Sequence, residues 1–231
     1  MYLIQKNINK LYQDGNTFFL NPQELKEITH HLKKNSFNVY KPHPFSEKNL
    51  LYTDNIPPII LLEIIISVPI RHQDILGSLF HLGIDEHLFG DIIISHNTYY
   101  FYTFSNMKPF FEIEFTKIKN NSITLIEQDL NYLENYQPSF EEITIITSSL
   151  RIDSVIAKII HTNRETIKDL IHDKKILYNY EILKDNSKGL QIGDTFSIRK
   201  YGKYQFNSII SNTKKNNLII KILKYSNNEK N

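Results

Sequence analysis

Ionisable side chains recur about one helical turn apart in the stretch "NRETIKDLIHDKK": they are Arg164, Lys168, His172 and Lys175. Ile167, Leu170 and Ile171 occupy the other side of the same stretch, at the i, i+3, i+4 spacing of a buried helix face. Thr162 or Asn163 can cap this helix, because a short polar side chain accepts from the free backbone N–H groups at a helix start. A charged helix face is most often only solvated, but a row of cations can also bind phosphates.

The distribution of charge favours the phosphate interpretation. The 231 residues carry a formal net charge of only +2. Residues 148–231 contain 16 basic and 8 acidic residues, whereas residues 1–147 contain 11 basic and 17 acidic residues. Clustered Lys and Arg attract polyanions, because binding to a phosphate backbone releases counterions. The basic third of the chain therefore predicts a nucleic-acid partner.

Several classes of protein are excluded by composition. The chain has no cysteine, which rules out disulfides, Cys-zinc sites and thiol catalysis. The N-terminus lacks an apolar run of signal-peptide length. The most apolar stretch, "IILLEIIISVPI", is interrupted by Glu63 and Pro69 and is far short of the ~20 residues of a membrane span. We therefore expect a cytoplasmic protein that does not bind membranes.

The sequence offers no recognisable catalytic or cofactor site. His72, His81 and His87 lack a metal-binding spacing such as H-E-x-x-H, so we interpret them as surface or hydrogen-bonded histidines. There is no Gly-rich phosphate loop and no acid–base constellation. We expect a protein that is not an enzyme, with no catalytic residues, no metal and no cofactor.

Two segments are expected before the basic part. Residues 1–55 are predicted to form an α-rich N-terminal domain, in which Asn21 caps a helix that begins with Pro22 and carries Glu24 in its first turn. Residues 56–132 predict a strand, a helix, two strands that meet at Asn97, a helix begun at Pro109 and a last strand. This βαββαβ order is the split, ferredoxin-like arrangement of many RNA-recognition domains.

Aromatic residues dominate the third strand of this predicted middle domain, "TYYFYTFS". RNA-recognition domains stack bases on such a strand. Since alternate side chains face opposite sides, either Tyr100 and Tyr102 or Tyr99 and Phe101 could be exposed. We take Tyr100 and Tyr102 as candidate base-stacking residues. The alternative, favoured by the missing Gly/Arg context of the usual RNA-binding signature, is that these aromatics serve packing.

The remaining chain is predicted to contain a linker at residues 133–147 that leads into a short strand, an RNA-binding domain at 148–225 and a disordered tail at 226–231. Within the domain, "RIDSVIAKII" and "NRETIKDLIHD" predict two amphipathic helices. "KILYN" and "EILKD" predict a tight hairpin, and Gly193-Asp194 predicts a turn before further strands. The expected fold class is α+β, with a C-terminal domain of two helices packed on a β-hairpin and further strands.

This C-terminal part resembles the small RNA-binding domain first known from the fourth protein of the small ribosomal subunit, here called the S-four domain. The residues that carry the resemblance are Arg151, Asp153, Arg164, Leu170, Ile171, Asn179, Gly193 and Asp194. Lys174 and Tyr180 stand where the family has glycine. Both positions are expected to need a positive φ, which costs a non-glycine residue ~1 kcal/mol. Asn163 replaces the usual serine and can still cap.

The stretch "RHQDILGSLFHLGIDEHLFGDIII" resembles the middle domain of YlmH-type proteins, which join an α/β N-terminal part, a split βαβ domain and an S-four domain. The shared residues are His72, Asp74, Leu76, Gly77, Leu79, Leu82, Gly83, Ile84, Gly90 and Asp91. Glu86 replaces an arginine of the family. The resemblance implies a bacterial, monomeric RNA-binding protein in ribosome-associated quality control. Its partners would be ribosomal RNA, tRNA and the large ribosomal subunit.

Taken together, the candidate RNA-binding residues are Arg151, Asn163, Arg164, Lys168, His172, Lys174, Lys175, Arg199, Lys200 and Lys203. Among them, Arg164 would lie in the first turn of the second helix, where free N–H groups and the positive end of the helix dipole bind phosphates.

Two alternatives stay open. S-four domains also accompany pseudouridine synthases and tyrosyl-tRNA synthetases, so the chain could be an accessory of an RNA-modifying enzyme, although it is too short for either catalytic domain beside the elements already assigned. The acidic first part could instead be a protein-interaction module that binds a basic ribosomal protein.

Overall fold

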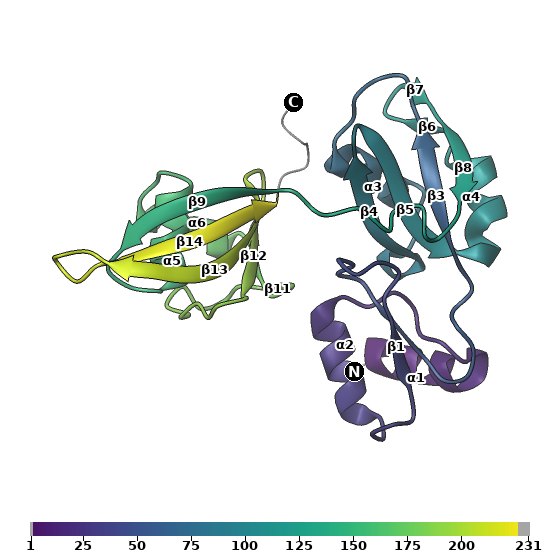
Figure 1. The fold of residues 1–231 in the computed structure, drawn as a ribbon, viewed down its shortest axis with the longest axis horizontal. Coiled ribbons are helices and arrows are strands. Elements are labelled where there is room, and N and C mark those ends of the chain that lie inside the picture. Colours follow the sequence, from purple (N-terminus) through teal and green to yellow (C-terminus); the bar gives the residue numbers. More distant parts are fainter. Residues whose placement is uncertain (1, 226–231) are drawn as a thin grey trace. The chain divides into compact units, whose positions relative to one another are not determined.

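The computed structural model describes residues 2–225, which form two compact units, residues 2–137 and 138–225 (Figure 1). Both units combine helices with antiparallel sheets, so the α+β class is confirmed. The expected boundary near residue 56 does not separate compact units, because residues 2–55 pack with the rest of the first unit. The predicted tail, residues 226–231, lies outside the described residues. Between residues 2 and 225, no helix is long and apolar enough to cross a membrane.

The N-terminal segment of the first unit contains two helices and a small sheet. Its elements are α1 (Tyr2–Asp14), α2 (Pro22–His31), β1 (Asn38–Tyr40) and β2 (Leu50–Tyr52). The predicted cap of α2 is confirmed: Asn21 Oδ1 accepts from the backbone N of Glu24 at 3.0 Å, and Glu24 Oε2 accepts from the backbone N of Asn21 at 2.9 Å. This reciprocal pair is a capping box. The strands β1 and β2 were not predicted.

The rest of the first unit is a four-stranded antiparallel sheet with two helices on one face. Its main elements are β3 (Ile59–Ile65), α3 (His72–His81), β4 (Phe89–Ser95), β5 (Thr98–Phe104), α4 (Lys108–Glu114) and β8 (Thr124–Gln128). Short elements join them: η1 (Glu86–Leu88), η2 (Ser105–Met107), β6 (Lys117–Ile118) and β7 (Asn121–Ser122). The strand order is β4-β5-β3-β8. His96 and Asn97 both have positive φ, as a two-residue hairpin turn requires.

Both faces of this sheet are covered. On one face, Ile75 and Leu79 of α3 and Phe111 of α4 pack against Phe101 of β5. On the other face, Phe19 and Leu50 of the N-terminal segment and Leu133 form one core cluster with strand residues that include Tyr100 and Tyr102.

The structure therefore corrects our base-stacking assignment. Tyr100 and Tyr102 keep only 4% and 0% of their surface exposed, and Tyr99 and Phe101 are buried on the helix side. An isolated RNA-recognition domain leaves one sheet face open for bases. Here the N-terminal segment occupies that face, so the aromatic residues of β5 serve packing.

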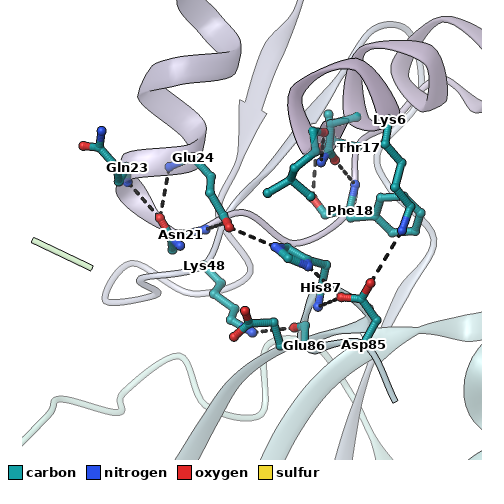
Figure 2. A network of polar contacts seen from close by, with 12 residues as sticks. Lys6, Thr17, Phe18, Asn21, Gln23, Glu24, Lys48, Asp85, Glu86 and His87 are labelled. Atoms are coloured by element: carbon teal, nitrogen blue, oxygen red, sulfur yellow. Dashed lines mark hydrogen bonds and ion pairs between the residues drawn. The ribbon is translucent and has the colours of Figure 1, made fainter. Parts of the chain in front are cut away.

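A histidine with two carboxylate neighbours links the N-terminal segment to the sheet (Figure 2). His87 Nε2 lies 2.9 Å from Glu24 Oε1, and His87 Nδ1 lies 2.6 Å from Asp85 Oδ1. Lys6 Nζ is 3.5 Å from Asp85 Oδ2. The hydrogen bond with Glu24 raises the pKa of His87, and Asp85 acts in the same direction. Residues 2–225 contain no group of three or more His, Cys, Asp or Glu that could hold a metal ion.

The Gly90-Asp91 pair explains why this segment can approach β4 so closely. A Cβ atom at Gly90 would lie 2.8 Å from the ring of Phe19, so only glycine leaves room for it. Asp91 Oδ2 accepts from the backbone N atoms of Glu47 at 2.8 Å and Lys48 at 3.2 Å. Burial raises the pKa of the Asp91 carboxyl to about 6.

The second unit is a six-stranded antiparallel sheet with two helices packed on one face (Figure 1). Its elements are β9 (Phe140–Thr147), α5 (Ile152–Ile159), α6 (Arg164–His172), β10 (Ile176–Tyr178), β11 (Glu181–Ile182), β12 (Thr195–Ile198), β13 (Gly202–Asn212) and β14 (Leu218–Tyr225). The strand order is β11-β10-β12-β13-β14-β9. Ile156 of α5 and Ile167 of α6 share a buried cluster with Phe196, Phe206 and Ile220 of the sheet.

Strand β9 lies where the sequence predicted a linker leading into a short strand, and it occupies residues 140–147 of the 133–147 segment. Residues 140–147 pair with β14 along their whole length, and Ile143 and Ile145 pack against the core. The acidic side chains of this segment had suggested a linker. They are compatible with an edge strand, where charges are common. Glu142 lies beside a lysine of β14, with its Oε2 2.9 Å from Lys221 Nζ.

We expect the free energy of unfolding to fall as the pH rises above about 4. The raised pKa of Asp91 lets the folded state keep a proton that the unfolded chain releases, so this contribution is lost as the pH rises from 3.8 through about 6. The contribution of His87 is lost at higher pH, as the pH rises from 6.5 through its raised pKa. Urea denaturation at a series of pH values measures both.

The variant Asp91→Asn separates the two groups. It should lack the decrease at the lower pH values, which is worth roughly 3 kcal/mol, and it should retain the decrease due to His87. Superimposable pH profiles for the variant and the wild type would contradict the role of Asp91.

Candidate nucleic-acid interface

Helix α6 exposes the basic and ionisable side chains expected from its sequence, with Glu165 and Asp169 exposed beside them. Ile167 and Ile171 are buried, whereas Arg164, Lys168 and His172 are exposed. The candidate residue Asn163 has a structural task, because its Oδ1 caps the helix by accepting from Thr166 N at 2.9 Å. Its side-chain oxygen is therefore committed to the helix.

Two arginines meet at the start of α5. Arg151, directly before the helix, donates from Nε to Asp153 Oδ1 at 3.2 Å and from Nη2 to Asp153 Oδ2 at 2.8 Å. Arg164, which begins α6, donates from Nη2 to Ser154 Oγ at 2.8 Å. Sequence reasoning named both arginines but missed these partners.

The carboxylate between them is almost completely buried, with 1% of Asp153 exposed. Although burial acts to raise it, the pKa of Asp153 lies below its ordinary value because of the hydrogen bond and charge of Arg151, with a smaller effect of Arg164. The carboxylate is therefore ionised at neutral pH and holds a pair of positive charges near it.

A second group of cations lies at the other end of α6. Lys174 and Lys175 follow the helix, and Arg199 and Lys200 follow β12. The backbone N of Arg199 donates to the carbonyl O of Lys175 at 2.9 Å, which continues the antiparallel pairing of β10 with β12. The two groups are separated by the length of α6, about 14 Å.

Left-handed backbone conformations shape the loops of this second group. Lys174, Tyr180 and Lys200 have φ values of 55°, 72° and 76°. The positive φ expected at Lys174 and Tyr180 is confirmed. Asn179 and Tyr180 together form a two-residue hairpin turn with φ positive at both residues, so the hairpin stays tight without the family glycine.

Asp194 holds this hairpin against β12. Its carboxylate accepts from Tyr178 Oη at 2.5 Å, from Asn179 Nδ2 at 2.9 Å and from the backbone N of Gln191 at 2.7 Å. Gly193 before it has a φ of 95°, which favours glycine. The Gly193-Asp194 pair was predicted only as a turn. The Asp194 carboxylate also holds the β10–β11 hairpin against β12. The partners that it uses for this, such as Tyr178 and Asn179, lie outside the Gly-Asp pair.

Lys203 lies apart from the other candidates. It pairs with Ser197 of β12, whose neighbours Phe196 and Ile198 point into the core, so Lys203 faces the side of the sheet without helices. There its Nζ donates to Tyr180 Oη at 3.1 Å and lies 4.9 Å from the ring centre of Tyr225. Strand register thus places Lys203 on the face of the sheet opposite to α5 and α6.

Comparisons with known proteins bear on the first unit in particular. Residues 61–132 match the family described as "Putative RNA-binding domain in YlmH". The YlmH-type resemblance expected from the sequence is thereby confirmed for this segment, which runs from β3 past β8. The resemblance of the second unit to an S-four domain stays a prediction.

One curated relative is "Ribosome-associated protein quality control protein P2" of Bacillus subtilis (strain 168), which is 27% identical over 148 residues. The match covers 64% of this chain and 58% of the relative. A solved structure, "Cell division protein ylmH from Streptococcus pneumoniae", superposes with a TM-score of 0.47 at 21% identity, over 57% of this chain and 90% of the other.

The positive φ of Lys174 gives a prediction for stability. Lys174→Gly should raise the free energy of unfolding by about 1 kcal/mol, because glycine relieves the left-handed strain. Lys175→Gly is the matched control: it removes the same charge from the next residue, which has no positive φ, and should destabilise the protein by about 0.5–1 kcal/mol. Urea denaturation measures both. A destabilised Lys174→Gly variant would show that the side chain contributes more than the strain costs.

Proposed function

We propose that this protein is a non-enzymatic RNA-binding protein that associates with the ribosome, and that residues 138–225 make its principal RNA contact. The observation that carries the proposal is the pair of cationic groups at the two ends of α6, in which Arg164, Lys174, Arg199 and Lys200 are exposed and Arg151 and Lys175 are half-buried. They lie on a unit that contains 15 Lys and Arg and 9 Asp and Glu. Charge of this kind selects a polyanion and makes binding depend on salt.

The order of elements supports an S-four assignment for this unit. Two helices, a tight hairpin and a Gly-Asp turn before a strand follow one another as in that domain, and Arg151, Asp153 and Arg164 occupy its characteristic positions. The first unit has the element and strand order of a ferredoxin-like βαββαβ domain. Together these observations support the proposal that the chain has the domain organisation of YlmH-type proteins.

The binding mode that fits this surface is contact with phosphates. Each cationic group presents side chains suited to phosphate oxygens, and the aromatic residues of β5 are buried and cannot stack bases. Phosphate contacts fix orientation and carry no base sequence information. We therefore propose recognition of RNA shape, with ribosomal RNA of the large subunit and tRNA as the partners, in quality control of stalled ribosomes. We further propose that this protein is a monomer and that it acts in the cytoplasm.

The first unit has a second candidate role as a protein-interaction module. Residues 1–137 contain 11 basic and 15 acidic residues, and the sheet face that could stack bases is closed. Both observations favour a basic protein surface, such as that of a ribosomal protein, as the partner of this unit.

The proposal predicts where RNA affinity resides. Replacing Lys174, Lys175, Arg199 and Lys200 with alanine in the full chain should weaken binding to purified large-subunit ribosomal RNA by about 100-fold at moderate salt. Several phosphate contacts would be lost, so the slope of log affinity against log salt should fall by about 3. Filter binding at several salt concentrations and comigration with large subunits in a sucrose gradient are the measurements.

The matched control neutralises four exposed lysines of the first unit, Lys26, Lys33, Lys34 and Lys41. This variant should bind nearly as the wild type does. Equal losses in the two variants would refute the assignment of the contact to the second unit. Reproducible pseudouridine formation or ATP consumption by the purified protein would refute the non-enzymatic assignment.

A further inference from the structure

An acidic side chain at the centre of the proposed RNA site requires an explanation. Asp153 lies between Arg151 and the start of α6, and its negative charge should repel the phosphates that the arginines attract. Its side chain is also buried, and a buried carboxylate is stable only when it is paired. A carboxylate at this position therefore lowers both the attraction for phosphates and the stability of the fold, unless it has a further role.

The contacts indicate what the carboxylate does. Asp153 takes two hydrogen bonds from one edge of the Arg151 guanidinium, Nε and Nη2, a side-on arrangement that fixes the plane of the group. The next residue, Ser154, accepts from Nη2 of Arg164. Consecutive residues in the first turn of α5 thus hold the two arginines from behind, and each guanidinium keeps further N–H donors.

The backbone around Arg151 is anchored as well. Ile152 N donates to Lys188 O at 2.8 Å, and Leu190 N donates to Leu150 O at 2.9 Å. Arg151 is therefore fixed at its main chain by a neighbouring segment and at its guanidinium by Asp153. A long side chain that is already ordered loses less conformational entropy when it binds a ligand.

We propose that Asp153 and Ser154 are positioning residues that hold Arg151 and Arg164 as a two-arginine clamp for one RNA phosphate group. This inference rests on the proposed function, since it names the part of the RNA that this end of α6 binds. Arg164 begins α6 and its side chain reaches Ser154 in the first turn of α5, so the clamp spans the N-terminal turns of both helices, whose dipoles add to its attraction for an anion. Two guanidiniums outweigh the single carboxylate, which is screened from the RNA because it lies behind them.

The test exploits the sign of a charge effect. Asp153→Asn raises the net charge by one, so simple electrostatics predicts tighter binding to RNA. Positioning predicts the reverse: binding of the full chain to purified large-subunit ribosomal RNA should weaken by about tenfold, the size of one charge-assisted hydrogen bond. Asp169→Asn is the matched control on the exposed side of α6, and it should bind as tightly as the wild type or more tightly.

Ser154→Ala tests the same idea at constant charge. It removes the acceptor of Arg164 and should weaken RNA binding by about threefold, the size of one ordinary hydrogen bond. Melting temperatures are recorded for every variant, and the salt dependence of affinity is the readout that a merely structural role would not move. Release of one arginine from the phosphate should lower the slope of log affinity against log salt by about 1.

The outcomes distinguish this inference from the proposed function. If the wild type binds ribosomal RNA without salt dependence, the proposed function fails. If the wild type and Arg164→Ala behave as an RNA contact requires, but Asp153→Asn binds at least as tightly as the wild type, the clamp is overturned and the function stands. If Asp153→Asn does not fold, the Ser154→Ala variant provides the test. An unchanged RNA affinity of that variant at an unchanged melting temperature would overturn the clamp.

Discussion

The burial of both faces of one small sheet limits which surfaces could serve the proposed RNA binding. Tyr100 and Tyr102 of β5 point toward Phe19 and Leu50, and the helices cover the opposite side. Burying a large apolar side chain contributes about 1.5–3 kcal/mol, so uncovering several of them together would unfold the unit. The face is closed in the folded protein. The proposed RNA recognition therefore falls to other surfaces, and the exposed cations are concentrated on the second unit.

Two acidic residues of the basic second unit form hydrogen bonds within the protein that fix the positions of neighbouring groups. Asp194 locks the β10–β11 hairpin to β12, and Asp153 orients an arginine at the start of α5. A buried carboxylate needs partners, and here the partners are the groups whose positions matter for the surface. In the proposed function the net positive charge would attract RNA over a distance, whereas these internal contacts decide where individual cations are held.

Local patterns in the sequence predicted the local structure well. The cap at Asn21, the helix from Arg164 and the left-handed residues Lys174 and Tyr180 depend on neighbours within a few positions, and all of them are present. The errors concern contacts between distant segments. Closure of the β5 face requires the N-terminal segment, and the short strand expected after Pro138 has a partner, β14, that only the fold reveals. Sequence spacing also cannot tell that Lys203 faces away from α6, because that depends on strand register.

The pairing of β9 with β14 sets the order in which the second unit can be completed. Phe140 lies opposite Tyr225, so the first strand of the unit pairs only with the last. During synthesis the two helices and the β10–β11 hairpin can form early, because their contacts are close in sequence. Strand β9 cannot form its ladder until β14 has left the ribosome. Until then the apolar side chains of Ile143 and Ile145 lack part of the core that they pack against. The unit is thus finished in a single late step, and a nascent chain that stops before β14 leaves an uncompleted sheet edge open to aggregation.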